Sequence, residues 1–383
     1  MLNSRRQANP ASRVRATIGR EFASCVVGLL VAAWVASSLQ AAETGLKSFP
    51  GMLKLTVDDE VIEGRPIAWS VARVHLLGRD GRLWEFSPRD ARDWQQAPHF
   101  KPYTVSQIRA ELLRELGREY AVTGSSHYMV AHAAGQRDRW AERFEELYRT
   151  FVHYFRVRGF TLKKPEFPLI GVVCRDRAHF ARYSAAQGSP APPGVLGYYS
   201  LTSNRIMLYD IDPREGFGNW HETAKTIIHE ATHQAAFNTG IHSRYTPPPL
   251  WVAEGLATLF EAPGVCDPRN HTSREDRINQ GRLDDFRRAV LPRHEPKLIK
   301  SLVASDGLFG SNSTAAYAES WALTFFLVET RPRKYAAYVT RTADRPPFSN
   351  YSSKERVADF EAVFGDNWEL LESHFLRFIA GLP

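Results

Sequence analysis

The segment His229-Glu-Ala-Thr-His233 constrains this chain more than any other feature, because it lies within a helical pattern. Histidines four residues apart on a helix project from the same face. Two neutral imidazoles on one face can bind a zinc ion, and a glutamate between them can serve as a general base. The pattern therefore predicts a helix on which His229 and His233 are metal ligands and Glu230 is the base.

A third ligand is expected from the segment Trp251-Val-Ala-Glu-Gly-Leu-Ala257, which follows a run of three prolines at 247–249. A carboxylate at Glu254 would complete a set of two histidines and one glutamate, leaving one coordination position for water. Two histidines are alternatives. His242 lies beyond the expected end of the first helix, and His221 lies eight residues before the first ligand. We expect one catalytic Zn²⁺ held by His229, His233 and Glu254.

The distribution of charge argues against a nucleic-acid partner. The chain has 383 residues and a formal net charge of +7, of which residues 1–42 carry +4, so that the remainder carries +3. No basic cluster with interleaved aromatic residues is present in the sequence. Nucleic-acid binding is therefore not expected.

The first 42 residues have the pattern of an export signal. Arginines up to Arg20 precede an uncharged run at 22–42, and Ala41 and Ala42 stand before Glu43. Small residues at this point suit cleavage by signal peptidase, whereas the run of 21 residues is also long enough to span a bilayer if it is retained. We expect an exported protein of bacterial type, periplasmic, envelope-bound or secreted, with a membrane contact only if this segment stays as an anchor.

Cysteine usage leaves two possibilities open. Beyond the leader the chain has only Cys174 and Cys266. In an oxidising compartment they can form one disulfide, or they can be two separate buried thiols. No Cys-x-x-Cys pair is present, which disfavours a thiolate zinc site.

Hydrophobic periodicity predicts an α+β fold. Strands are expected at 53–57, 71–77, 83–86, 120–123, 127–131, 168–174, 196–201 and 205–209, and helices at 104–116, 138–158, 178–184, 222–239, 250–261, 316–330 and 368–379. The expected organisation is a leader or anchor at 1–42, a β-rich segment at 43–135, and a metallopeptidase-like domain at 136–383 in which the metal site lies between a small sheet and a helical C-terminal part.

The two metal-binding motifs resemble those of the gluzincin zinc metallopeptidases, in which a helix glutamate followed by glycine is the third ligand. The stretch from about Phe167 to Val328 also resembles an uncharacterised family of secreted bacterial metallopeptidases, a domain of unknown function. The segments that carry this second likeness are Gly197-Tyr-Tyr199, Asn204-Arg-Ile206, His233-Gln-Ala-Ala-Phe-Asn238, Pro249-Leu-Trp-Val-Ala-Glu254 and Tyr317-Ala-Glu-Ser-Trp-Ala322. The metzincin pattern would require a histidine where this chain has Thr239.

The resemblance implies further roles. Tyr317 is similar to a tyrosine that stabilises the oxyanion in gluzincin aminopeptidases, a role that needs a donor aimed at the developing negative charge. Tyr198, Tyr199 and His221 are weaker candidates for it. A strand just before the metal helix, either 196–201 or 205–209, is expected to bind an extended substrate by strand addition. Thr258 and Glu261 follow Glu254 by one and two turns of helix and are placed to hydrogen-bond the ligands.

The expected activity is hydrolysis of amide bonds in a peptide or protein, with Glu230 and zinc activating water and Tyr317 assisting. Two alternatives stay open at this point. One is a non-catalytic envelope or matrix-binding protein that retains the scaffold, and the other is a zinc amidase acting on cell-wall material.

Overall fold

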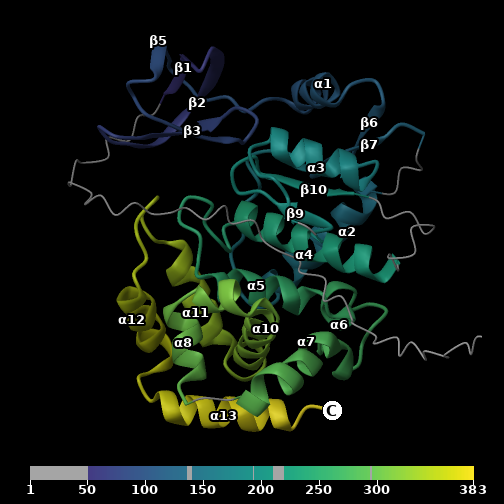
Figure 1. Cartoon of the computed structure of the whole chain (residues 1–383), viewed down its shortest axis with the longest axis vertical. Helices are drawn as coiled ribbons and strands as arrows, with labels where there is room; N and C mark the ends of the chain where they lie inside the picture. Colours follow the sequence, from purple (N-terminus) through teal and green to yellow (C-terminus); the bar gives the residue numbers. More distant parts are fainter. Residues whose placement is uncertain (1–50, 136–139, 193, 210–219, 294–295) are drawn as a thin grey trace, which may run out of the picture.

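The computed structural model describes residues 51–135, 140–192, 194–209, 220–293 and 296–383. The expected leader or anchor at 1–42 lies outside the described residues. In Figure 1 a small sheet occupies the upper end, a second sheet lies below it, and helices fill the lower end. This arrangement confirms the expected mixed fold, with strands towards the N-terminus and a helical C-terminal part.

The first sheet is antiparallel and has the strand order β4-β3-β2-β1-β5. Its strands are β1 (Met52–Val57), β2 (Glu60–Trp69), β3 (Val74–Gly78), β4 (Leu83–Phe86) and β5 (Ala91–Ala97). Leu55, Ile62 and Leu76 form part of its core. The strands of the β3–β4 hairpin were both predicted, although β3 begins at Val74 and not at 71, because the side chain and backbone of Ser70 close a turn onto Arg73.

Helix α1 (Val105–Leu116) joins the two sheets and begins where the sequence predicted. Thr104 accepts a hydrogen bond from the backbone N–H of Gln107, and the Gln107 side chain accepts one from the backbone N–H of Thr104. This reciprocal cap satisfies two N–H groups that the helix leaves unpaired.

The second sheet has the order β6-β7-β8-β10-β9. Its strands are β6 (Tyr120–Gly124), β7 (Tyr128–Ala133), β8 (Leu169–Cys174), β9 (Gly197–Tyr199) and β10 (Arg205–Tyr209). The pairs β7–β8 and β8–β10 are parallel, and the outer pairs are antiparallel. This sheet crosses the expected boundary at residue 135, because β6 and β7 pair into it instead of remaining with the N-terminal strands.

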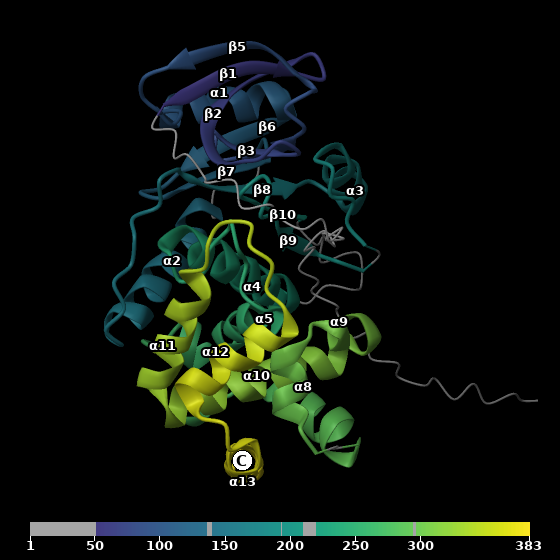
Figure 2. The same cartoon turned by 90° about the vertical axis from the view of Figure 1, so that its left-hand side faces the viewer.

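Helices cover both faces of this second sheet (Figures 1 and 2). On one face, α1 and α3 (Arg177–Ala186) pack through Ile108 and Phe180. On the other, α2 (Trp140–Arg156) and α4 (Trp220–Thr239) pack through Phe144 and Ile227. The sheet therefore fixes α4, the helix that carries both predicted histidine ligands, between itself and the C-terminal helices.

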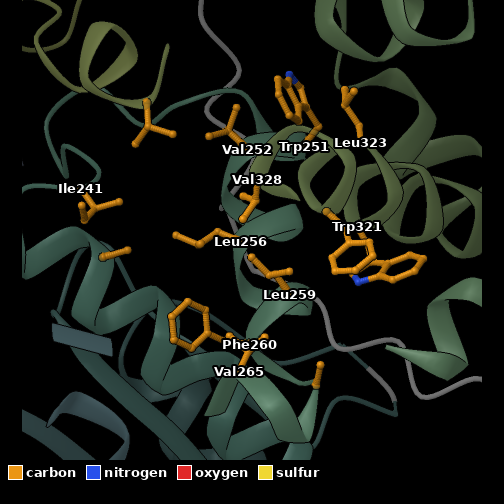
Figure 3. Packing of buried hydrophobic residues seen from close by; sticks show 14 of the residues in the cluster. Ile241, Trp251, Val252, Leu256, Leu259, Phe260, Val265, Trp321, Leu323 and Val328 are labelled. Carbon is orange, nitrogen blue, oxygen red and sulfur yellow. The ribbon is translucent and has the colours of Figure 1, made fainter. Parts of the chain in front are cut away.

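The C-terminal part packs around α5 (Leu250–Phe260) and α10 (Ser313–Thr330), the two helices in closest contact. The other helices in this part are α6 (Pro263–Cys266), α7 (Gln280–Asp285), α8 (Leu298–Ala304), α9 (Gly307–Ser311), α11 (Pro332–Ala343), α12 (Ser353–Phe364) and α13 (Trp368–Ala380). Figure 3 shows Leu256 of α5 and Val328 of α10 in the shared core, and in Figure 1 α5 lies directly beneath α4, with which it is in contact.

Gly255 allows this close approach of α5 to α10. A Cβ atom at this position would lie 2.1 Å from Oγ1 of Thr324 and 2.6 Å from the backbone oxygen of Ser320. Any side chain here would force the two helices apart, next to the predicted ligand Glu254. The glycine of the Glu-Gly pair is therefore explained by packing and not by a turn.

We expect Gly255→Ala to destabilise the fold by about 1–3 kcal/mol, since the overpacking cost exceeds the gain of up to ~1 kcal/mol in helix propensity. Denaturant unfolding measures the change. Gly310→Ala is the matched control, because a Cβ there meets no atom within 4 Å. Equal stability of the two variants would show that α5 and α10 have room to separate.

Two further findings concern the whole described chain. Among the described helices, none combines the length and the apolar character needed to cross a membrane. Cys174 is buried in β8, Cys266 is partly buried at the end of α6, and both are free thiols. Of the two possibilities left open by the sequence, the structure has two separate thiols.

Candidate metal centre

The predicted metal ligands meet in the interior of the protein. His229 and His233 lie one turn apart on α4, with their Nε2 atoms 3.0 Å apart. Oε2 of Glu254 lies 3.1 Å from Nε2 of His229 and 3.6 Å from Nε2 of His233. All three side chains are at most 1% exposed, so the group is buried within the fold.

The chain between the two helices positions Glu254. After α4 ends, Arg244 donates hydrogen bonds to the backbone oxygens of Leu201 and Thr202, which fastens the connecting loop to the turn between β9 and β10. The proline run then ends at Pro249, directly before α5 begins. Because Glu254 follows within the first turns of α5, its carboxylate points back at the histidines of α4.

The residues present fit a metal ion. The Nε2 atoms of the two histidines face each other at 3.0 Å beside a carboxylate oxygen, so that lone pairs converge on one point whenever both imidazoles are neutral. Oε1 of Glu254 has no hydrogen-bond partner among the described residues, although it is buried. Candidate ligand atoms from His229, His233 and Glu254 all lie within 4.8 Å of one another. Two histidines and one carboxylate are a donor set that suits zinc and leaves a position open.

The candidate ligand His229 is oriented by a hydrogen bond at Nδ1, the ring nitrogen that faces away from His233 and Glu254. Its Nδ1 lies 2.8 Å from Oε1 of Glu261, which is buried at the end of α5. Glu261 in turn accepts a hydrogen bond from Nδ2 of Asn279 at 2.9 Å and faces Arg282 at 3.9 Å. Such a carboxylate fixes the tautomer and the orientation of a metal-binding imidazole. Thr258, the other residue expected here, donates to the backbone oxygens of Glu254 and Gly255, so it contacts the main chain of Glu254 and not its carboxylate.

The pKa values of His229 and Glu254 favour a positive charge between their side chains. Burial opposes the charge on His229, but hydrogen bonds to Glu254 and Glu261 outweigh it and raise the pKa of His229 to about 10. Burial also opposes ionisation of Glu254, but the charge interaction with His233 and the hydrogen bonds of both histidines lower its pKa to about 2. Without a metal, a proton on His229 balances one of the two negative charges of Glu254 and Glu261, and a metal must displace this proton to bind.

Glu230 lies beside the ligands and is held by the edge strand of the sheet. Its Oε2 accepts a hydrogen bond of 2.7 Å from the backbone N–H of Tyr199 in β9, whereas its Oε1 has no partner among the described residues. Burial raises the pKa of Glu230 to about 8. A carboxyl group with a raised pKa and one uncommitted oxygen is suited to take up and release a proton near neutral pH.

Next to Glu230, polar side chains of α4 form hydrogen bonds with the second sheet and its turn. Nε2 of Gln234 donates to the backbone oxygens of Ile170 and Asn204. The amides of Asn204 and Asn238 hydrogen-bond to each other, and Asn204 accepts from the hydroxyl of Tyr199. These contacts account for several of the polar residues in the sequence motifs, and they fix β9 relative to the metal ligands.

The predicted Tyr317 lies near the ligands on α10. Its ring centroid is 6.3 Å from that of His229, its exposed fraction is 6%, and the ring packs edge-on against Phe309. The guanidinium of Arg282 lies over the same ring at 5.1 Å. The structure therefore brings Tyr317 to the metal centre from the side opposite the sheet.

The other candidates lie elsewhere or point away. His242 is buried against Phe237, and neither ring nitrogen has a partner among the described residues. Burial, aided by nearby His233, lowers its pKa to about 3, so it is neutral, and it does not belong to the group of candidate ligand atoms. The hydroxyls of Tyr198 and Tyr199 bond to Ser189 and Asn204. The side chain of His221 lies outside the described residues.

Two residues of the site were not identified from the sequence. Asn279 and Arg282 belong to the start of α7, in a stretch between 262 and 315 where the hydrophobic pattern predicts no distinct element. Asn279 accepts from the N–H of Arg282 as a helix cap while donating to Glu261. The capping signal was readable in the sequence, but the contact with Glu261 requires the tertiary fold.

Comparison with known proteins gives two similarities. A family model described as a protein of unknown function (DUF1570) matches residues 223–349, a segment that contains His229, Glu230, His233, Glu254 and Tyr317. No curated protein matches. Among solved structures, the chain is similar to a point mutant of an M1 zinc metallopeptidase from Deinococcus radiodurans, at 13% identity and a TM-score of 0.35. That match covers 70% of this chain and 52% of the other, so this chain spans about half the length of that metallopeptidase.

Proposed function

We propose that this chain is an exported zinc peptidase that hydrolyses amide bonds in peptides or proteins. The observation that carries the proposal is the fully buried set of His229, His233 and Glu254 with Glu230 beside it on the same helix. A bound zinc ion would polarise the scissile carbonyl and lower the pKa of water. Glu230 accepts a proton from the attacking water through its uncommitted Oε1 and passes it to the leaving nitrogen.

The edge strand β9 supports binding of an extended main chain. Ser200 donates its N–H to the oxygen of Arg205 in β10, so the preceding N–H, that of Tyr199, points to the outer side of the sheet. There it meets Glu230. A peptide added along this outer edge would therefore pass the proposed base, pairing with the other outward main-chain groups of β9, since the N–H of Tyr199 is already bonded to Glu230. Of the two strands considered from the sequence, β9 has this position.

The test uses purified, zinc-loaded protein with a peptide library and, in a separate arm, cell-wall fragments containing amide bonds. We expect cleavage of peptides that stops when zinc is removed by a chelator and returns on stoichiometric addition of zinc, because the ligands bind one ion. Cleavage of wall fragments alone would favour an amidase. A zinc-loaded protein that cleaves neither would rule out the proposed activity and favour a binding role.

We propose Tyr317 as the hydrogen-bond donor to the developing oxyanion, because its ring packs beside His229. Tyr317→Phe keeps the ring and its contacts with Phe309 and Arg282. We expect unchanged zinc content and a kcat about 10²–10³-fold lower, the usual effect of removing one such donor. An unchanged kcat for the cleaved peptide would assign Tyr317 to packing only.

A further inference from the structure

A cavity lies among the C-terminal helices, apart from the candidate metal ligands. It has a volume of about 420 Å³ and is bounded by α8, α9, α10 and the turn at 286–290. Its lining combines apolar side chains, including Leu298, Leu302, Leu308 and Ala315, with the polar Ser301, Ser305, Ser311 and Asn312. Its volume and its apolar side chains suit a small organic molecule. No residue of the metal centre lines it.

Among the residues that the structure describes, Glu319 is the one charged side chain that lines this cavity. It is 8% exposed, and no hydrogen bond or ion pair reaches its carboxylate from the described part of the chain. Burial and the nearby Glu372 raise its pKa to about 7. The Glu319 oxygens are not among the fully buried atoms that lack a partner, so the carboxylate opens into the cavity and can accept hydrogen bonds from a ligand there.

Other buried carboxylates of this protein are paired. Glu145 accepts hydrogen bonds from Ser125 and from the backbone of His127. Glu372, the neighbour of Glu319, accepts from the backbone N–H groups of Lys297 and Ile299 at the start of α8. Glu372 is occupied in this way and does not line the cavity. The described residues therefore offer the cavity one carboxylate, fewer than the several oxygen ligands that a hard divalent cation requires.

We propose that this cavity binds a small organic cation, an ammonium group on an apolar body, with Glu319 as its counter-ion. The apolar walls bury the body of the ligand, and the ammonium group donates hydrogen bonds to the carboxylate. The proposal does not depend on peptidase activity. The cavity is linked to the candidate metal centre by packed side chains, because Leu308 lines the cavity and the adjacent Phe309 packs against Tyr317.

Benzylamine and its neutral counterpart benzyl alcohol are suitable probes, with binding to the zinc-loaded protein measured by calorimetry. We expect benzylamine to bind the wild type roughly ten- to a hundredfold more tightly than benzyl alcohol, the value of a hydrogen bond to a charged group. Glu319→Gln keeps the shape of the side chain and removes its charge. In this variant the preference for the amine should disappear.

Two further variants distinguish binding in this cavity from binding at the metal centre. Ala315→Leu fills the cavity and should weaken both probes. His233→Ala removes a zinc ligand, and a preference for benzylamine that persists there excludes coordination of the amine to zinc. The proposal is overturned if the wild type binds the two probes equally or not at all, if Glu319→Gln keeps the preference, or if the preference is lost with His233→Ala.

Discussion

Replacement of Glu230 by glutamine is expected to lower kcat on a cleaved peptide about 10²–10⁴-fold, the usual contribution of a general base. Zinc content should stay unchanged, because Glu230 is not among the ligand atoms that converge on the ion. The fold should also be retained. The amide oxygen of glutamine still accepts the hydrogen bond from the N–H of Tyr199, and a neutral group suits a site whose burial already raises the pKa of Glu230 to about 8.

Three measurements on the same protein samples make this result decisive. Peptide turnover gives the activity, elemental analysis gives the zinc content, and thermal unfolding reports the fold. Glu146→Gln, the same change at an exposed position of α2, is the matched control. Retention of full turnover in Glu230→Gln would assign proton transfer to another group. Loss of zinc from this variant would instead make Glu230 part of the ligand set.

The second large effect is expected for Glu254→Ala, which removes one of three ligands. Zinc affinity should fall by more than the 10–100-fold that loss of an outer partner usually costs. The truncation also leaves His229 and His233 without the carboxylate that lies 3.1 and 3.6 Å from their Nε2 atoms. Competition with a chromogenic chelator measures the affinity.

Glu261→Gln provides a reference against which the loss of zinc affinity in Glu254→Ala can be compared. Glu261 contacts Nδ1 of His229 and not the metal position, so its substitution should weaken zinc binding within the 10–100-fold range. The expected order of zinc affinity is therefore wild type, Glu261→Gln and Glu254→Ala. Stoichiometric zinc in Glu254→Ala at wild-type affinity would place the third ligand elsewhere, with buried His242 the next residue to test.

The features predicted from the sequence are those with local causes. The spacing of His229 and His233 follows from helix geometry alone, and Thr104 was readable as a cap because its partner is three residues away. Glu254 was predicted because a proline run returns the chain towards α4. These inferences needed no knowledge of how distant segments pack.

The features that were missed depend on long-range contacts or on weak patterns. β2 contains Gly64 and Pro66, and β5 is largely exposed and polar, so neither alternates as a half-buried strand should. The assignment of β6 and β7 to the second sheet depends on a parallel pairing of β7 with β8 across helix α2. Contacts of this kind cannot be inferred from one segment at a time.

The bond from Tyr199 to Glu230 has a consequence for how this site tolerates change. The donor is a backbone N–H, so nearly any amino acid at position 199 supplies it, and only proline removes it. Insertion or deletion of a residue in β9 would instead exchange the outward and inward N–H groups, since their direction alternates along a strand. The orientation of the proposed base, Glu230, therefore depends on the length and register of a three-residue strand. Substitutions other than proline keep the hydrogen bond, and a shift of one residue abolishes it.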